Sequence, residues 1–125
     1  MRKWRNERGA VAVEFALLLP LLVTLLIGIM EFGMFYSAQI SVTAAAREAA
    51  RVMAIGNDPA AARTAARAAS PVLDPALTDT QIAISGACVS GATAKITISY
   101  SLPALTGLFG PSFGITGRAA MRCGG

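Results

Sequence analysis

The chain has 125 residues, a formal net charge of +4 and two cysteines, and aromatic residues make up only 6% of it. This length leaves room for one small domain, and so few large side chains cannot fill a wide core. The first nine positions supply +3 of this charge, because they contain four basic residues, Arg2, Lys3, Arg5 and Arg8, and one acid, Glu7. We therefore expect neither a sizeable catalytic domain nor a nucleic-acid-binding surface, which needs basic and aromatic residues on one face.

An apolar run follows the basic leader of residues 1–9. No charged residue lies between Phe15 and Met30, and the 21 residues from Ala10 to Met30 would form a helix of roughly 31 Å, enough to span a bilayer. A basic leader before such a run predicts that the N-terminus stays in the cytoplasm. A cleaved secretory signal would be shorter and followed by a small-x-small site, so we favour a membrane-spanning helix.

Pro20 lies near the middle of this run. Proline removes a backbone hydrogen bond and pushes against the preceding turn, which predicts a kink around residues 16–19. Proline also occurs in many membrane helices without a special role, and the sequence leaves both interpretations open.

The helix is expected to continue beyond the membrane, because residues 36–54 contain no glycine or proline and are rich in alanine. We predict one helix from about Ala10 to Ala54, within a segment 10–55. Glu48 and Arg51 are spaced to pair on one face. The alanines at 45, 49, 46 and 50 form small-xxx-small edges suited to a close neighbour, although a solvated alanine-rich helix would show the same pattern.

Residues 56–125 are expected to form a small α+β domain. In the sequence GNDP, Gly56 is placed near a helix C-cap, Asp58 at an N-cap and Pro59 at the first position of a short second helix. Ser70 and Pro71 should end that helix. Its Arg63 and Arg67 share a face and repel mildly unless an acid lies nearby, so we expect a solvated face.

After the second helix, the spacing of apolar residues changes from a helical period to a period of two. Residues 80–85, TQIAIS, and 94–100, AKITISY, alternate apolar with polar, and residues 113–123, FGITGRAAMRC, form a weaker third run. These runs predict three antiparallel strands in a small C-terminal sheet. The connection from Ser101 to Gly114 is apolar for an exposed loop, and covering the sheet, lying on the membrane surface and meeting a partner all remain open.

Cys88 and Cys123 both follow the apolar run, so the predicted topology places them in an oxidising compartment where disulfides persist. We favour a disulfide between them, with two unpaired small core residues as the alternative. A metal site does not fit two cysteines 35 positions apart in a chain without histidine.

No catalytic constellation is apparent in the sequence. Serine catalysis lacks a histidine base, and there is no phosphate-cradling glycine pattern. The acids after the leader occur singly, at Glu14, Glu31, Glu48, Asp58, Asp74 and Asp79. We expect a protein that is not an enzyme and has no cofactor.

The start of the apolar run resembles the substrate motif of prepilin peptidases, a glycine followed at the fifth position by glutamate and then by an aromatic. Counting from Gly9, Ala10 is first, Glu14 fifth and Phe15 sixth. Together with GIMEFG and AAREAARVMA, this stretch resembles the TadE-like pseudopilins of tight-adherence (Tad or Flp) pilus systems, over roughly residues 8–54. The resemblance implies a pilin-like fold and a minor pilin or assembly factor, cleaved after Gly9 by a prepilin peptidase.

A carboxylate at the edge of an apolar run is costly, on the order of 3 kcal/mol at worst, unless it is paired. Cleavage after Gly9 would create a partner, because the new amine of Ala10 lies one helical turn from Glu14. In a staggered assembly the carboxylate would instead accept the amine of an adjacent subunit, the arrangement usually inferred for type IV pilins. The remaining alternative is a simple membrane anchor whose Glu14 side chain reaches the lipid headgroups.

The resemblance further implies its partners and location: the prepilin peptidase, other pilin and pseudopilin subunits and the Tad inner-membrane assembly machinery. The chain would be a single-pass protein of a bacterial inner membrane, with a cytoplasmic N-terminus and an extracytoplasmic C-terminal domain, and would enter the pilus. The rival hypothesis is an uncleaved single-pass membrane protein whose outer domain binds another envelope partner.

Overall fold

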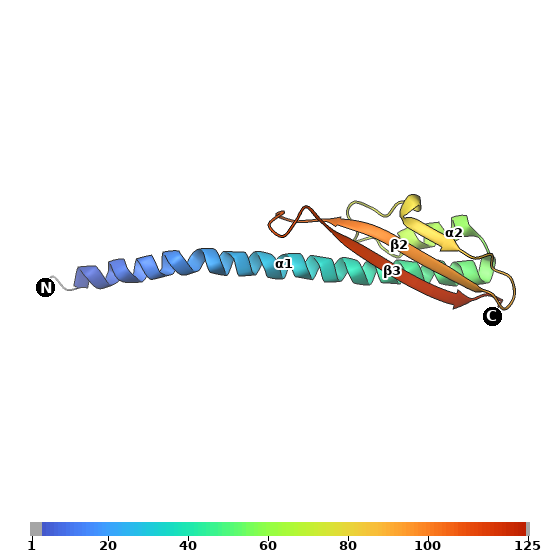
Figure 1. Cartoon of the computed structure of the whole chain (residues 1–125), viewed down its shortest axis with the longest axis horizontal. Coiled ribbons are helices and arrows are strands. Elements are labelled where there is room, and N and C mark those ends of the chain that lie inside the picture. The colour runs from blue at the N-terminus through green and yellow to red at the C-terminus, as the bar shows by residue number, and fades with distance from the viewer. Residues whose placement is uncertain (1–3, 125) are drawn as a thin grey trace. The chain divides into compact units, whose positions relative to one another are not determined.

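The computed structural model describes residues 4–124. Its elements follow in the order α1 (Trp4–Gly56), α2 (Pro59–Ala68), a short 3-10 helix η1 (Asp79–Gln81), β1 (Ile82–Ser85), β2 (Thr93–Pro103) and β3 (Ser112–Arg122), as Figure 1 shows. The chain divides into two compact units, Met1–Gly33 and Met34–Gly125. The predicted α+β class, with a long helix, a short helix and three antiparallel strands, is confirmed.

Residues 4–33 of the first unit are helical. Most of their large apolar side chains from Val11 onward are exposed, as in a helix that is surrounded by lipid or by other helices. By length and composition, α1 is the one helix of the described chain suited to cross a membrane.

The start of α1 differs from the prediction. The helix begins at Trp4 and not near Ala10, so residues 4–9 of the basic leader are helical, whereas residues 1–3 lie outside the described part. Glu7 in the first turn interacts favourably with the helix dipole, and a single glycine at position 9 weakens a helix without ending it.

Helix α1 also continues through Pro20 without interruption, and the hydroxyl of Thr24 donates to the Pro20 carbonyl over 2.8 Å. The kink near Pro20 stays a prediction.

In the second unit, small residues of α1 form the centre of the core. Ala45, Ala46, Ala49 and Ala50 are fully buried, together with Val42. The close neighbour predicted by the alanine spacing is therefore present, and the alternative of a solvated helix is wrong. These residues pack with Ala62 and Ala66 of α2 and with the inner face of the sheet.

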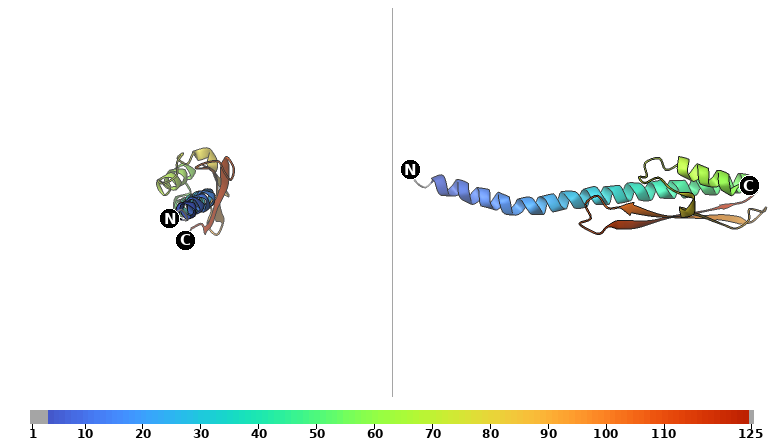
Figure 2. Two further views of the ribbon diagram at one scale, coloured as in Figure 1. Left: turned by 90° about the vertical axis from the view of Figure 1, so that its left-hand side faces the viewer. Right: turned by 90° about the horizontal axis from the view of Figure 1, so that it is seen from above.

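The sheet has the order β1–β2–β3, with both pairs antiparallel. Alternate residues of β2 face the core, namely Ala94, Ile96, Ile98, Tyr100 and Leu102. The register places Ile82 of β1 and Gly117 of β3 on either side of Ile98. In Figure 2 the sheet lies on one side of the second unit, and α2 and the C-terminal half of α1 lie on the other. This arrangement matches the single apolar face of each strand.

Strands β2 and β3 extend beyond the predicted runs, because residues 101–103 pair with residues 112–114. The true connection is therefore residues 104–111. Its large apolar side chains are exposed, so it does not cover the sheet. Ladder hydrogen bonds to a long partner strand extend the pairing past the point where the alternating pattern fades.

Gly117 permits a close contact between the sheet and α1. A Cβ added there would lie 2.7 Å from both the Cγ1 and the carbonyl oxygen of Val42. Real side chains do not approach this closely, so β3 packs on α1 only because position 117 has no side chain.

The boundary between α1 and α2 is formed largely as predicted. Helix α1 ends at Gly56, and Asn57 takes the left-handed conformation, with a φ of 49°. The Asp58 carboxylate accepts from the amides of Ala60 and Ala61 over 3.0 and 3.2 Å, which confirms its N-cap role ahead of Pro59. The α2 helix ends at Ala68, two residues before Ser70.

Arg67 is exposed, as the predicted solvated face of α2 requires, but it also has an acidic partner. Arg67 forms an ion pair with Asp79 of η1, which supplies the acid that the local sequence lacks. Asp79 lies 12 positions further along the chain, so helical spacing does not predict this partner.

Candidate processing and assembly site

The predicted processing residues all lie near the start of α1, in a part of the helix whose described residues are exposed. Gly9, Ala10 and Glu14 are exposed, as is the ring of Phe15. A Cβ added at Gly9 would meet nothing within 4 Å, so this part of the helix is open to an approaching protein. Ala10 and Glu14 are separated by four positions in a continuous helix and lie on one face, one turn apart.

Glu14 forms no ion pair with any other residue that the structure describes. In the intact chain the nitrogen of Ala10 belongs to a peptide bond and carries no charge. The carboxylate thus lies beside an apolar run with no cation paired to it among the described residues, a costly position in a membrane. If the residues before Ala10 were removed, an ammonium group would lie one turn away and could become a partner for Glu14.

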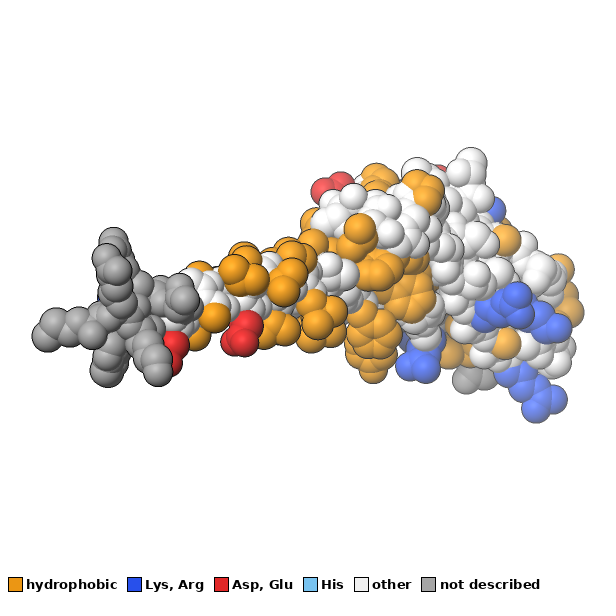
Figure 3. All heavy atoms as spheres, turned by 60° about the vertical axis from the view of Figure 1, so that its left-hand side comes forward, with side chains coloured by type: hydrophobic (Ala, Val, Ile, Leu, Met, Phe, Trp, Pro, Cys, Tyr) orange, Lys and Arg blue, Asp and Glu red, His pale blue; other side chains and the backbone are white. Residues whose placement is uncertain are grey.

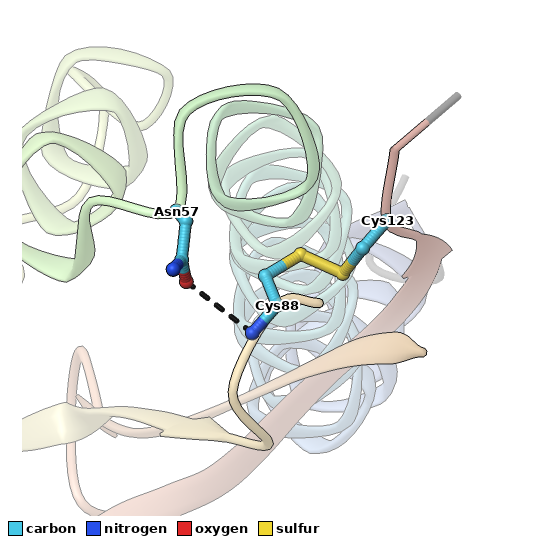
Figure 4. Close-up of a disulfide and its surroundings, with 3 residues drawn as sticks. All are labelled: Asn57, Cys88 and Cys123. Carbon is cyan, nitrogen blue, oxygen red and sulfur yellow. Dashed lines mark hydrogen bonds between the residues drawn. A yellow bond between two sulfur atoms is a disulfide. The ribbon is translucent and has the colours of Figure 1, made fainter. Parts of the chain in front are cut away.

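A disulfide joins Cys88 to Cys123 at the C-terminal end of the second unit, which is the pairing that the sequence favours. Figure 4 shows the bridge next to Asn57, whose side-chain oxygen accepts from the Cys88 amide over 3.2 Å. On the other side, the Gly124 amide donates to the carbonyl of Ala54 over 3.4 Å. The bridge therefore joins the β1–β2 connection to the end of β3 beside the end of α1.

Three groups among the described residues of the second unit, Glu48, Arg51 and Tyr100, have shifted pKa values. The Glu48 carboxylate accepts from Arg51 over 3.0 and 2.5 Å, which confirms the predicted pair and lowers the pKa of Glu48. The buried Tyr100 hydroxyl donates to the Pro75 carbonyl over 2.8 Å. Burial, and to a smaller extent the charge of Asp74, raises the pKa of Tyr100 above its ordinary value of about 10.

The outward face of the sheet carries a basic row that sequence reasoning did not single out. It consists of Lys95, Arg118 and Arg122, which form no ion pair with other described residues. Thr97 and Thr93 lie opposite the two arginines, and Lys95 lies opposite Ala120. Figure 3 shows Lys and Arg side chains gathered on the second unit, and apolar side chains along the described part of the first. The alternation of side chains along a strand could have revealed this row, since residues 118 and 122 of one strand must share a face.

The described chain offers little for catalysis. Within residues 4–124, no three His, Cys, Asp or Glu side chains gather where they would hold a metal ion. A shallow open hollow lies on the outward sheet face, lined by Lys95, Thr97 and Arg118, and another lies beside Gln39 and Arg47 of α1. The expectation that the protein is not an enzyme stays a prediction.

Together, these features fit a class of protein: among the described residues, one helix suited to cross a membrane leads into a small disulfide-bonded α+β domain. The family comparison narrows this class. Residues 9–51 match the model of the family described as TadE-like protein, so the resemblance drawn from the sequence is confirmed as a similarity over this part of the chain. No curated protein matches the chain, and no solved structure matches it.

Proposed function

We propose that the chain is a minor pilin or pseudopilin of a Tad (Flp) pilus, cleaved after Gly9 by a prepilin peptidase. One observation supports this most directly: the TadE-like match starts at Gly9 and extends along α1 through the alanine-rich buried stripe. The matched segment thus contains the motif residues Ala10, Glu14 and Phe15 and the helix that holds the second unit together.

The local structure suits a peptidase substrate at the Gly9–Ala10 bond. A protease needs its substrate backbone extended, whereas Gly9 is helical in the intact chain. Glycine is the weakest helix former apart from proline, by about 1 kcal/mol relative to alanine. The helix therefore opens more readily at Gly9 than it would with alanine there, and no other part of the described chain packs against this position.

After cleavage, the apolar part of α1 supplies the assembly surface. This helix is apolar on all sides and exposed, so it suits both a bilayer and a bundle of similar helices. The Glu14 carboxylate, lying one turn from the new amine of Ala10, would fix the axial position of one subunit against the next. The basic row on the sheet remains exposed for contacts within the assembly.

The location follows from the charge pattern. The basic leader would hold the N-terminus in the cytoplasm, and the second unit would lie on the outer side of a bacterial inner membrane. The partners would be the prepilin peptidase, other pilin subunits and the inner-membrane Tad machinery. An oxidising compartment on the outer side agrees with the bridge between Cys88 and Cys123.

Co-expression with the prepilin peptidase of a Tad system tests this function. A C-terminally tagged chain should become shorter only when the peptidase is present. Gly9→Leu should block the shortening, because a bulky residue would stand next to the scissile bond. Gly33→Leu is the matched control, since Gly33 is also a helical glycine of α1 with open space around it. Equal length of all three proteins with and without peptidase would support the uncleaved anchor instead.

A further inference from the structure

The connection between β2 and β3, residues 104–111, exposes three large apolar side chains. Leu105, Leu108 and Phe109 are 50%, 57% and 56% exposed. The sequence of this hairpin tip, ALTGLFGP, contains no charged residue. An uncharged tip with three neighbouring large apolar side chains is unusual for a surface that faces only water.

The hairpin tip is ordered by its own hydrogen bonds. The Ala104 amide donates to the Pro111 carbonyl over 3.1 Å, and the Gly110 amide donates to the Gly107 carbonyl over 3.3 Å. The Leu108 amide donates to the hydroxyl of Thr106 over 3.3 Å. Several backbone groups of the tip are thus satisfied internally, which lowers the cost of placing it in a less polar medium.

Contacts within the second unit fix the level of the hairpin tip along α1. The rings of Phe35 and Phe113 meet edge to face with centroids 6.1 Å apart, and the Gln39 side chain donates to the Thr116 carbonyl over 3.1 Å. Strand β3 therefore runs along α1 in the same direction as the helix. The tip, which precedes Phe113, lies at the end of the unit where the chain enters it at Met34, far from the C-terminus (Figure 1).

This end of the unit is joined covalently to the apolar run. Phe35 follows Met30, the last residue of that run, by only five positions in the chain. Phe109 precedes Phe113 by four residues, a reach of up to about 13 Å in an extended strand. Short stretches of chain therefore separate the hairpin tip from Phe113, and Phe35 from the end of the apolar run. Aromatic residues at 32, 35 and 36 follow that run, as aromatic residues do at membrane interfaces.

We propose that the hairpin tip is a second membrane contact: Leu105, Leu108 and Phe109 lie in the interfacial region of the bilayer that α1 spans. Apolar side chains without nearby charge favour the boundary between headgroups and acyl chains. The short chain between the apolar run and the second unit favours lipid over a protein partner, because it limits how far the tip can move from the bilayer once α1 is inserted. The contact would hold the second unit upright on the membrane before assembly.

This proposal rests on membrane insertion of α1, which forms part of the proposed function. The test uses the full chain, with Trp4 replaced by phenylalanine, reconstituted in phosphatidylcholine vesicles that contain lipids brominated near the headgroup end of the acyl chains. A single tryptophan is introduced by Phe109→Trp or, in a second protein, by Leu108→Trp. The matched control is Val89→Trp, because Val89 is 62% exposed and lies next to the disulfide at the opposite end of the sheet. A further variant, Leu22→Trp, with lipids brominated at mid-chain, reports on α1 itself.

We expect the tryptophan emission of the Phe109→Trp and Leu108→Trp proteins to be quenched several-fold more strongly than that of the Val89→Trp protein, independent of the protein-to-lipid ratio. Quenching as weak as that of the control, with Leu22→Trp strongly quenched, would overturn the membrane contact and leave insertion intact. An emission change that grows with protein density and does not respond to bromine would also overturn it and indicate a contact between copies. Weak quenching of Leu22→Trp would refute insertion, and the membrane contact with it.

Discussion

Replacing Gly117 by alanine should destabilise the second unit, because β3 has no space for a side chain at this point. The added Cβ would lie 2.7 Å from Val42 Cγ1 and 2.7 Å from the Val42 carbonyl oxygen, whereas ordinary contacts begin at 3.4 Å. Strand and helix would have to separate by about 0.7 Å (3.4 − 2.7) across a core of fully buried alanines. Overpacking of this kind costs roughly 1–3 kcal/mol. For a unit of this size, a loss of about 2 kcal/mol corresponds to a melting temperature lower by roughly 8–16 °C.

Thermal unfolding of the full chain in detergent, followed by the circular dichroism of the sheet, measures this effect. Gly114→Ala is the matched control, because Gly114 lies on the same strand with nothing within 4 Å of an added Cβ, and its melting temperature should stay within about 2 °C of the parent. Val42→Ala in the Gly117→Ala background should restore little stability, since the Val42 carbonyl remains in place. Equal melting temperatures for Gly117→Ala and Gly114→Ala would refute the close approach.

Three further predictions concern the bridge, the motif and the buried tyrosine. When the chain is denatured without reductant, it should show no thiol accessible to alkylation, and two alkylated thiols would exclude the bridge. Cys88→Ser should lower the free energy of unfolding in urea by roughly 4 kcal/mol on the chain-entropy model. Glu14→Ala should leave membrane extraction behaviour unchanged but reduce co-purification with partner pilins, and normal co-purification would exclude its role in register. The raised pKa of Tyr100 means that the folded state favours the neutral hydroxyl. The contribution of this neutral hydroxyl to the free energy of unfolding is therefore complete below about pH 10 and is lost as the pH rises through the folded-state pKa. Tyr100→Phe should cost about 1 kcal/mol at neutral pH and should flatten the loss of stability above pH 10, and an unchanged alkaline profile would contradict this cause.

Much of the fold was predictable because its determinants are local. The alternating pattern of β2 identifies its inner face, since successive side chains of a strand point to opposite sides. Asp58 and Pro59 form a helix start whose geometry depends on neighbouring residues only. The alanine spacing of α1 predicted a close neighbour without showing which element it would be.

The remaining features depend on residues far apart in the sequence. Nothing near Gly117 indicates that its missing side chain makes room for Val42. The pairing of Arg67 with Asp79 requires η1 to lie beside α2, which helical spacing does not show. The start of α1 at Trp4 was missed because the basic leader was treated as separate from the membrane helix, although no residue in it ends a helix. The residues of the processing motif are exposed on one helix, but their cleavage is chemistry that the fold alone does not reveal.

The central claim is that a pilus system processes this chain and uses its new N-terminus. N-terminal sequencing of the protein extracted from membranes of cells that carry the complete Tad system tests that claim most directly. The proposed function predicts a sequence beginning AVAVEF, with Ala10 as the first residue and Glu14 as the fifth. Recovery of intact chains that begin only at Met1 would contradict the pilin assignment and favour an uncleaved membrane anchor.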